Sequence, residues 1–342
     1  MTVLETHATD LGSWPPQQLR SMLIDMIQAR RNSDRFFALQ RQGRTGTSAP
    51  ITGQEATPVG AAHALDPTID WVVPQYREQV ALARFGEGVL AAHARYNRGH
   101  PSGSHYPEGT RVFPPQISLA AQIPQALGLA WGMHLRGEPG VVAVFFGDGA
   151  SSEGDFYEAG NFAGVLKAPL IMILVNNQWA ISTPTSKQTA ATTFADKAKA
   201  FGIPGVRVDG NDVLAMYDAV ATARRRATNG DGPTLIEAFT FRMGHHTTAD
   251  DPTRYVAEEE RRAWADKDPI AGFTARLTAA GLWTEQDSTD ALQSADETFD
   301  RLFALAEADH PQPDAFFDHV YANPPQRLLA QRHAFNEERE HG

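Results

Sequence analysis

The 342-residue sequence contains no cysteine, and this absence excludes a disulfide-stabilised scaffold and a thiolate metal site. No run of apolar residues approaches the roughly 20 that are needed to span a bilayer. The first residues (MTVLETHATDLGSWPP) have neither a basic start nor an apolar centre, so they do not have the pattern of a signal peptide. We therefore expect a cytoplasmic protein with no membrane partner.

Positive charge is also scarce. The chain carries 30 Lys and Arg against 41 Asp and Glu, a net charge of −11, which argues against a nucleic-acid partner. Its apolar content of 42% is ordinary for a globular protein with a large core. We expect residues 1–14 to be a flexible lead-in and residues 15–342 to form one domain. Charged segments with helical patterns predict a helical C-terminal region from about residue 258 to residue 342.

The centre of the chain predicts two neighbouring strands with a helix between them. Residues 141–146 (VVAVFF) and 170–175 (LIMILV) are short, unbroken apolar runs, which is typical of strands buried on both faces. A helical pattern that starts near Ser151 or Ser152 separates the two runs. Such a crossover makes the strands parallel, so both end at the same edge of the sheet. The predicted fold class is α/β, with a mostly parallel central sheet flanked by helices.

Polar side chains follow both predicted strands. Gly147-Asp148-Gly149 closes the first strand, and Asn176-Asn177 closes the second. A carboxylate and an amide oxygen at one sheet edge are suitable ligands for Mg²⁺, and the amides at the start of the intervening helix suit an anion. No Gly-Lys-Ser/Thr follows, and no glycine stands three residues after Gly149, so neither a Walker loop nor a dinucleotide fingerprint is present. The residues alone therefore indicate Mg²⁺ with a diphosphate.

The spacing of these two strand ends resembles the thiamine diphosphate motif. Further segments are similar to the alpha subunit of the decarboxylating component of 2-oxo acid dehydrogenase complexes, over roughly Gln17 to the C-terminus: GDFYEAGNFAGVLKAP, NNQWAISTP, GIPGVRVDGND, GDGPTLIEAF and FRMGHHTTADDPTRY. The resemblance implies a thiamine diphosphate-binding fold with thiamine diphosphate and Mg²⁺ as cofactors. It implies that the metal ligands are Asp148, Asn177 and the main-chain carbonyl of Trp179. It adds Gly147, Gly149 and Ala150 to the residues around the cofactor.

Two further segments gain a cofactor role from the resemblance. Tyr76 and Arg77 follow a predicted short strand at residues 70–74 and would contact the diphosphate, although a Tyr-Arg pair by itself is more often an ordinary surface pair. Residues 116–133 are small, apolar and uncharged, and predict a buried helix. Main-chain groups near Ile117 and Leu119 would contact the aminopyrimidine ring. The side chain of Leu119 would support the V-shaped conformation of the cofactor.

Adjacent histidines follow the last predicted strand. Paired loop histidines are more often exposed surface residues, but the resemblance implies that His246 contacts the cofactor and assists acylation of the lipoyl group. We therefore predict His246 as the catalytic residue of this chain. Arg242 is expected to pair with Asp250 or Asp251 and so to order the loop.

The resemblance implies oxidative decarboxylation of a 2-oxo acid and transfer of the acyl group to a lipoyl domain of the acyltransferase component. In the family the glutamate that activates the cofactor comes from a beta subunit, and no substitute stands out here, so an α₂β₂ heterotetramer is expected. The motifs favour pyruvate as the substrate, with a branched-chain 2-oxo acid (3-methyl-2-oxobutanoate) as the alternative. A non-catalytic binding subunit with a thiamine fold is a remoter alternative. A self-sufficient thiamine enzyme would require a longer chain.

Overall fold

The described part of the chain is organised around one parallel sheet. The computed structural model describes residues 2–3, 11–310, 313–318 and 320–341. Within these residues the main sheet has six strands in the order β1-β7-β8-β4-β3-β2, and every neighbouring pair is parallel. The strands are β1 (Thr2–Val3), β2 (Trp71–Val73), β3 (Val142–Gly147), β4 (Leu170–Asn176), β7 (Gly205–Asp209) and β8 (Thr234–Phe239). This arrangement confirms the predicted α/β class.

Both faces of the central strands are covered, which explains their unbroken apolar sequences. Along β3, Ala143 and Phe145 pack into a cluster with α6 (Val213–Thr228). Val144 and Phe146 pack into a cluster with α4 (Gln122–Leu135) and α5 (Gly154–Leu166) on the opposite face. Because alternate residues of a strand point to opposite faces, a strand between two helical layers needs apolar side chains at every position.

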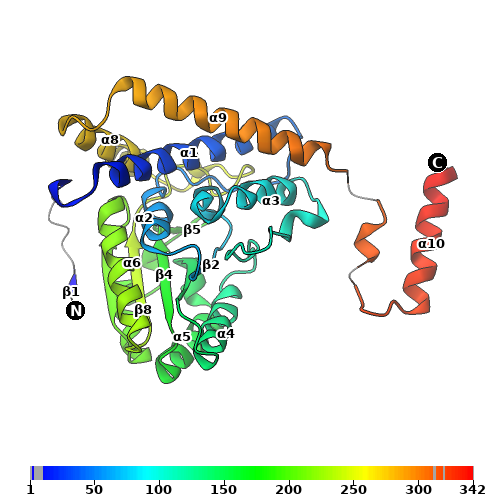
Figure 1. The fold of residues 1–342 in the computed structure, drawn as a ribbon, viewed down its shortest axis with the longest axis horizontal. Coiled ribbons are helices and arrows are strands. Elements are labelled where there is room, and N and C mark those ends of the chain that lie inside the picture. Colours follow the sequence, from blue (N-terminus) through cyan, green and yellow to red (C-terminus); the bar gives the residue numbers. More distant parts are fainter. Residues whose placement is uncertain (1, 4–10, 311–312, 319, 342) are drawn as a thin grey trace.

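Helices flank the sheet and extend the chain beyond it (Figure 1). The α-helices are α1 (Pro16–Arg41), α2 (Ala56–Ala64), α3 (Gly88–Asn97), α4 (Gln122–Leu135), α5 (Gly154–Leu166), α6 (Val213–Thr228), α7 (Glu258–Ala265), α8 (Pro269–Ala279), α9 (Glu285–Ala308) and α10 (Gln326–His341). The longest two, α1 and α9, run side by side, and α4 lies next to α5. The expected helical C-terminal region is therefore present from α7 onward. Of the described helices, none has the length and apolarity needed to cross a bilayer.

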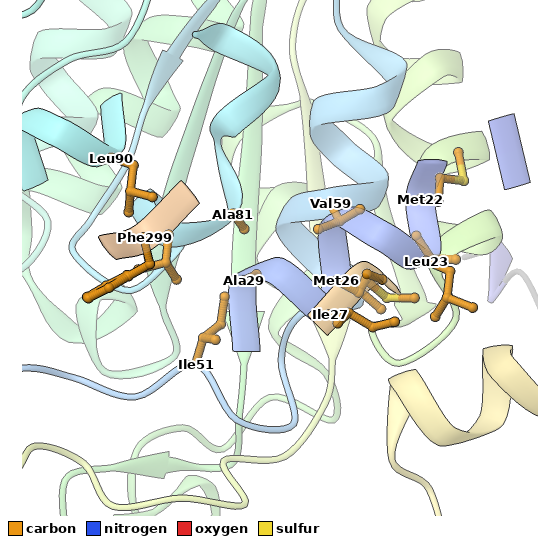
Figure 2. Packing of buried hydrophobic residues seen from close by; sticks show 14 of the residues in the cluster. Met22, Leu23, Met26, Ile27, Ala29, Ile51, Val59, Ala81, Leu90 and Phe299 are labelled. Carbon is orange, nitrogen blue, oxygen red and sulfur yellow. The ribbon is translucent and has the colours of Figure 1, made fainter. Parts of the chain in front are cut away.

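A third apolar cluster joins the N-terminal and C-terminal helices. Figure 2 shows Met22, Met26 and other side chains of α1 near Val59 of α2, with Phe299 of α9 in the same cluster. Partly buried ion pairs reinforce this contact, because Arg30 of α1 donates to both Glu55 and Asp268, at 2.7 and 2.6 Å. The segment that precedes α2 is thereby held against the helical layer.

One predicted helix starts later than expected. The apolar pattern over residues 116–133 predicts a helix from Gln116, but α4 begins at Gln122, and residues 118–121 form a turn in which Ala120 has a φ of 66°. A left-handed residue interrupts a right-handed helix, and apolar composition does not reveal this turn. A smaller shift affects α5, which begins at Gly154 after a 3₁₀ turn over Gly149–Ser152.

The two ends of the chain are only partly described. The predicted lead-in over residues 1–14 falls largely on positions 1 and 4–10, which lie outside the described residues, and its flexibility stays a prediction. Thr2–Val3 pairs with Val206 and Arg207 of β7. At the other end, α10 stands apart from the sheet and its flanking helices (Figure 1).

Candidate functional site

Every residue predicted to contact the cofactor lines one cavity. The cavity has a volume of about 550 Å³ and lies at the carboxyl ends of β3 and β4. Its lining includes all the predicted site residues: Tyr76, Arg77, Ile117, Leu119, Gly147, Asp148, Gly149, Ala150, Asn177, Trp179 and His246. Ligands of open α/β sheets bind outside this edge of the sheet. The structure thus brings together side chains from five separate segments of the sequence.

Asp148 is the most deeply buried acid of this cavity. Its side chain is 1% exposed, and its Oδ2 accepts a hydrogen bond of 2.6 Å from Nε2 of Gln188. Burial raises the pKa of Asp148 to about 6, because a carboxylate loses its hydration there, and the bond from Gln188 opposes this shift only in part. The charge of Arg242 also opposes the shift in part, and a buried carboxylate whose hydrogen-bond donor is an uncharged amide is a favourable place for a metal ion.

Asn177 lies beside Asp148 at the end of the neighbouring strand, and its orientation is fixed. Its Nδ2 donates to Oε1 of Gln54 at 3.0 Å, which directs the amide oxygen away from Gln54. That oxygen accepts from the main-chain N–H of Trp179 at 3.3 Å. The carbonyl of Trp179 accepts from Arg242 at 3.0 Å and keeps a second lone pair for another partner. These oxygens and the Asp148 carboxylate are hard donor atoms of the kind that Mg²⁺ prefers.

Two buried arginines bring positive charge to the site: Arg77 lines the cavity, and Arg242 bonds to the carbonyl of Trp179. Arg77 is 6% exposed and donates to the carbonyls of Pro50 and His246, at 2.5 and 3.2 Å. Arg242 is 3% exposed and donates to two carbonyls and to the hydroxyl of Tyr255. None of these partners is a carboxylate, so neither guanidinium group forms an ion pair in these contacts. Buried positive charge at a cavity favours an anionic ligand.

His246 lies between the two arginines. Its Nδ1 is 3.3 Å from Nη2 of Arg77 and 3.4 Å from Nη1 of Arg242, and its main-chain N–H donates to Asp250 at 2.7 Å. Burial, together with the positive charges of Arg77 and Arg242, lowers the pKa of His246 to about 4. The imidazole is therefore neutral near pH 7, with a ring nitrogen that can accept a proton or a hydrogen bond.

The loop that carries His246 is ordered by a different link from the one expected. Arg242 was predicted to pair with Asp250 or Asp251. Instead it donates to the hydroxyl of Tyr255 at 2.7 Å, and that hydroxyl donates to Oδ2 of Asp250 at 2.5 Å. The prediction of a direct pair is wrong because a phenol stands between the two charges. The link still connects the end of the last strand to the histidine loop.

The remaining predicted residues lie at the rim. The Tyr76 ring is half-buried and stands edge-on to the ring of His246 at 6.5 Å. Ile117 and Leu119 lie in the segment before α4 and are 56% and 43% exposed, although both line the cavity. Gly149, in the turn after β3, lies close to Ala180, because a Cβ added at Gly149 would be 2.8 Å from Cβ of Ala180.

Sequence reasoning missed several residues of the site. Gln54 and Gln188 hold the two predicted metal-ligand side chains, and neither was predicted in that role. The lining of the same cavity also includes the polar residues Ser33, His93 and Asn97, from α1 and α3. Gln54 and Gln188 lie outside the helices and strands, and the sequence around them does not reveal which side chain each one contacts.

The donor set suits a cation held together with a phosphate group. Among the described residues no three His, Asp or Glu side chains gather into a metal-binding group, so a cation at Asp148 would need other oxygens. Amide and main-chain oxygens, water and phosphate can provide them for Mg²⁺. In addition, Nε2 of Gln54 is buried and without a hydrogen-bond partner, so a donor is available to an acceptor in the cavity. The residues present therefore fit both parts of a metal–diphosphate group.

A parallel sheet with this cavity at its carboxyl edge defines an α/β protein that binds a small ligand at the ends of β3 and β4. The chain belongs to the dehydrogenase E1 component family, whose model matches residues 24–314. This membership confirms the resemblance to the alpha subunits of thiamine diphosphate-dependent 2-oxo acid dehydrogenases and identifies the chain as part of such an enzyme.

Relatives of known description match almost the whole chain. The sequence is 42% identical over 325 residues to pyruvate dehydrogenase E1 component subunit alpha of Staphylococcus epidermidis, covering 94% of this chain and 87% of the relative. The subunit of the same name from Staphylococcus aureus matches with the same identity and coverage. That from Bacillus cereus is 43% identical over 322 residues, covering 94% of this chain and 86% of the relative.

Proposed function

We propose that this chain is the alpha subunit of a pyruvate dehydrogenase, which decarboxylates pyruvate oxidatively and passes the acyl group to a lipoyl domain of the acyltransferase component. The observation that carries the proposal is the convergence of all the predicted cofactor residues on one cavity in a chain of this family. The names of the bacterial relatives support pyruvate over the branched-chain alternative. The expected location is the cytoplasm.

In this proposal the chain holds the diphosphate end of thiamine diphosphate. Asp148, Asn177 and the carbonyl of Trp179 would bind Mg²⁺, and Arg77 with Tyr76 would contact the phosphate oxygens. Ile117 and Leu119 would face the aminopyrimidine ring. The bound cofactor supplies the carbanion chemistry of decarboxylation. The chain fixes the position of the cofactor, and the buried arginines stabilise its negative charge.

His246 is the proposed catalytic residue. Its neutral imidazole lies at the cavity wall, where it can hold a proton or donate a hydrogen bond as the acyl group leaves for the lipoyl acceptor. The depressed pKa keeps it from carrying a permanent charge that would compete with the arginines. Burial, with a smaller contribution from the charges of Arg77 and Arg242, thus keeps the histidine neutral, and the two arginines make the site positive.

The proposed assembly is an α₂β₂ heterotetramer with a beta subunit. The support is the family membership together with the description of the relatives as subunits named alpha. The beta subunit would provide the group that activates the aminopyrimidine. A non-catalytic binding role is the remaining alternative, and the retention of Asp148, Asn177, Arg77 and His246 around one cavity speaks against it.

The test is co-expression with the cognate beta subunit and assay of the purified complex with pyruvate and with 3-methyl-2-oxobutanoate, in the presence of thiamine diphosphate and Mg²⁺. We expect a kcat/KM at least about tenfold higher for pyruvate, because even one or two extra methyl groups change binding in a close-fitting pocket by this order. A preference for the branched acid would replace the proposed substrate. Cofactor binding without decarboxylation of either acid would favour the non-catalytic role.

A further inference from the structure

A 3₁₀ helix, η7 (Phe194–Phe201), is connected to the ends of both central strands although none of its residues lines the cavity. Thr193 and Asp196 begin this helix with reciprocal hydrogen bonds between side chain and main chain, which fix its first turn. Lys197 extends from η7 to the turn after β3, and the main-chain N–H of Ala195 faces the side chains at the end of β4. The helix can therefore act on the site only through other residues.

The ammonium group of Lys197 contacts the turn that follows β3. It donates to the carbonyl and to Oγ of Ser151, at 2.9 and 3.0 Å, and to the hydroxyl of Tyr157 at 3.1 Å. These three acceptors match the three N–H donors of an ammonium group. Ser151 is fully buried, and its Oγ donates to the carbonyl of Asp148 at 2.8 Å. Hydrogen bonds thus connect Lys197 through Ser151 to the main chain of the predicted metal ligand.

Three aromatic rings surround the ammonium group of Lys197. The ring centroids of Phe156, Tyr157 and Phe194 lie 5.7, 5.4 and 5.3 Å from Nζ. Rings at such distances attract a cation, so they favour the position in which Nζ meets Ser151. None of the three hydrogen-bond partners of Nζ is a carboxylate, and a charged donor forms a stronger bond to a neutral oxygen than a neutral donor does. A lysine therefore orders this turn more firmly than a neutral side chain would.

The first turn of η7 is also connected to the end of β4. The N–H of Ala195 donates to Oε2 of Glu237 at 2.9 Å, and Oε1 of Glu237 accepts from Nδ2 of Asn176 at 2.8 Å. Glu237 is 1% exposed, so its carboxylate requires buried donors of this kind. Asn176 directly precedes Asn177. One helical turn outside the cavity is thus linked to both strand ends that carry the predicted metal ligands.

We propose that Lys197 is a positioning residue, whose ammonium group holds the turn Gly149–Ser152 through Ser151. In the conformation held in this way, Asp148 and Ala150 line the cavity. A 3₁₀ turn of four residues has poor hydrogen-bond geometry of its own, so a donor from another segment matters for its conformation. The inference rests on the proposed function where it concerns the ligand, because the group placed by this turn is then thiamine diphosphate with Mg²⁺.

The first test is Lys197→Met, with Lys199→Met as the matched control. Methionine keeps an unbranched apolar side chain against the rings but has no N–H donor. Lys199 lies on the same helix, is exposed and pairs with Asp196. In the assembled protein without cofactor, we expect hydrogen exchange over Gly149–Ser152 to be at least about tenfold faster in Lys197→Met, the scale of one hydrogen bond to a charged group. Exchange in Lys199→Met should match the wild type.

Equal exchange rates in the two methionine variants would overturn the proposal. So would faster exchange throughout the chain together with a lower unfolding temperature of the cofactor-free protein, because Lys197 would then contribute only to general stability. Faster exchange confined to the turn after β3 is the result that supports a positioning role.

Cofactor affinity is the second readout. We expect Lys197→Met to raise the dissociation constant of thiamine diphosphate at saturating Mg²⁺ about tenfold, measured by calorimetric titration of the assembled protein, and to change kcat at saturating cofactor less than about threefold. Ser151→Ala should weaken binding in the same way. Because both residues act along one connection, the double variant should lose less affinity than the product of the two single losses. Losses that multiply would show that Lys197 acts by another route and would contradict the proposal.

The two readouts separate this proposal from the proposed function. If the wild-type complex binds no thiamine diphosphate, the proposed function fails, and the exchange rates at the turn still decide the role of Lys197. If the wild type binds the cofactor and Lys197→Met binds it equally tightly, the proposed function stands and the role of Lys197 is wrong.

Discussion

The side-chain amide of Gln188 donates a 2.6 Å hydrogen bond to Oδ2 of Asp148 and a 3.0 Å hydrogen bond to the carbonyl of Thr183. One amide therefore connects the predicted metal carboxylate to the loop that follows Asn177 and Trp179. Its own Oε1 is buried without a hydrogen-bond partner. Gln188 is a positioning residue in this arrangement, because it selects the orientation in which the Asp148 carboxylate faces the cavity.

Replacing Gln188 by leucine should leave the carboxylate free to rotate, and we expect the Mg²⁺ concentration needed for half-maximal activity to rise about tenfold, with kcat changed less. Gln188→Glu should be worse, because it removes the donor and places a second negative charge beside Asp148. The neighbouring exposed Lys187 provides the control, since Lys187→Ala should leave the Mg²⁺ requirement unchanged. Titration of activity and of cofactor binding with Mg²⁺ checks both results.

The Asp148 carboxylate is the centre of the predicted metal site. Asp148→Asn should abolish the stabilisation of the assembled protein by thiamine diphosphate with Mg²⁺, measured as the shift of the unfolding temperature on adding both. The fold should survive the change, because burial disfavours the charged form of Asp148 when no cation is present, as its raised pKa of about 6 indicates. An unchanged temperature shift in the variant would remove the basis for a metal site at this strand end.

Asp148 and Asn177 can be predicted from the sequence because of two physical constraints. Buried parallel strands require unbroken apolar runs, and such runs are visible in the sequence at residues 141–146 and 170–175. Parallel strands also share a carboxyl edge, so the polar residues that follow them must meet. The main features of the sheet and the centre of the site follow from these two constraints.

The residues that support the centre could not be predicted in the same way. Gln188 reaches Asp148 from 40 positions away and Arg242 reaches Trp179 from 63 positions away, and both do so from segments outside the regular strands and helices. Loop geometry of this kind leaves no periodic pattern in a sequence. The left-handed turn at Ala120 was missed for a related reason, because its neighbours have the composition of a buried helix.

A pair of adjacent histidines allows a controlled test of catalysis. His246 faces the cavity between Arg77 and Arg242, whereas His245 stacks on Phe37 with ring centroids 5.5 Å apart. His246→Ala should lower the rate of lipoyl acylation at least about a hundredfold, which is typical of removing a group that handles a proton. His245→Ala should lower it less than about threefold. Comparable losses in the two variants would assign the effect to the loop rather than to the imidazole of His246.

His93, a buried histidine that lines the cavity, predicts a pH dependence of stability. His93 shares hydrogen bonds with Gln79 and Asn97, at 2.9 and 3.0 Å, and burial lowers its pKa from 6.5 to about 4. The unfolded chain therefore takes up a proton at His93 below about pH 6.5, whereas the folded chain does so only near pH 4. This difference favours the unfolded state as the pH falls through that window.

Between pH 7 and pH 5 the wild-type protein should consequently lose about 2 kcal/mol more unfolding free energy than His93→Gln, which has no group to protonate at this position. The difference between the two proteins isolates the histidine, because all other titrating groups are common to both. Chemical denaturation of the assembled protein at several pH values measures it. If the unfolding free energies of the two proteins change with pH in parallel, His93 takes up its proton equally in the folded and unfolded states. The hydrogen bonds to Gln79 and Asn97 would then not hold a neutral ring.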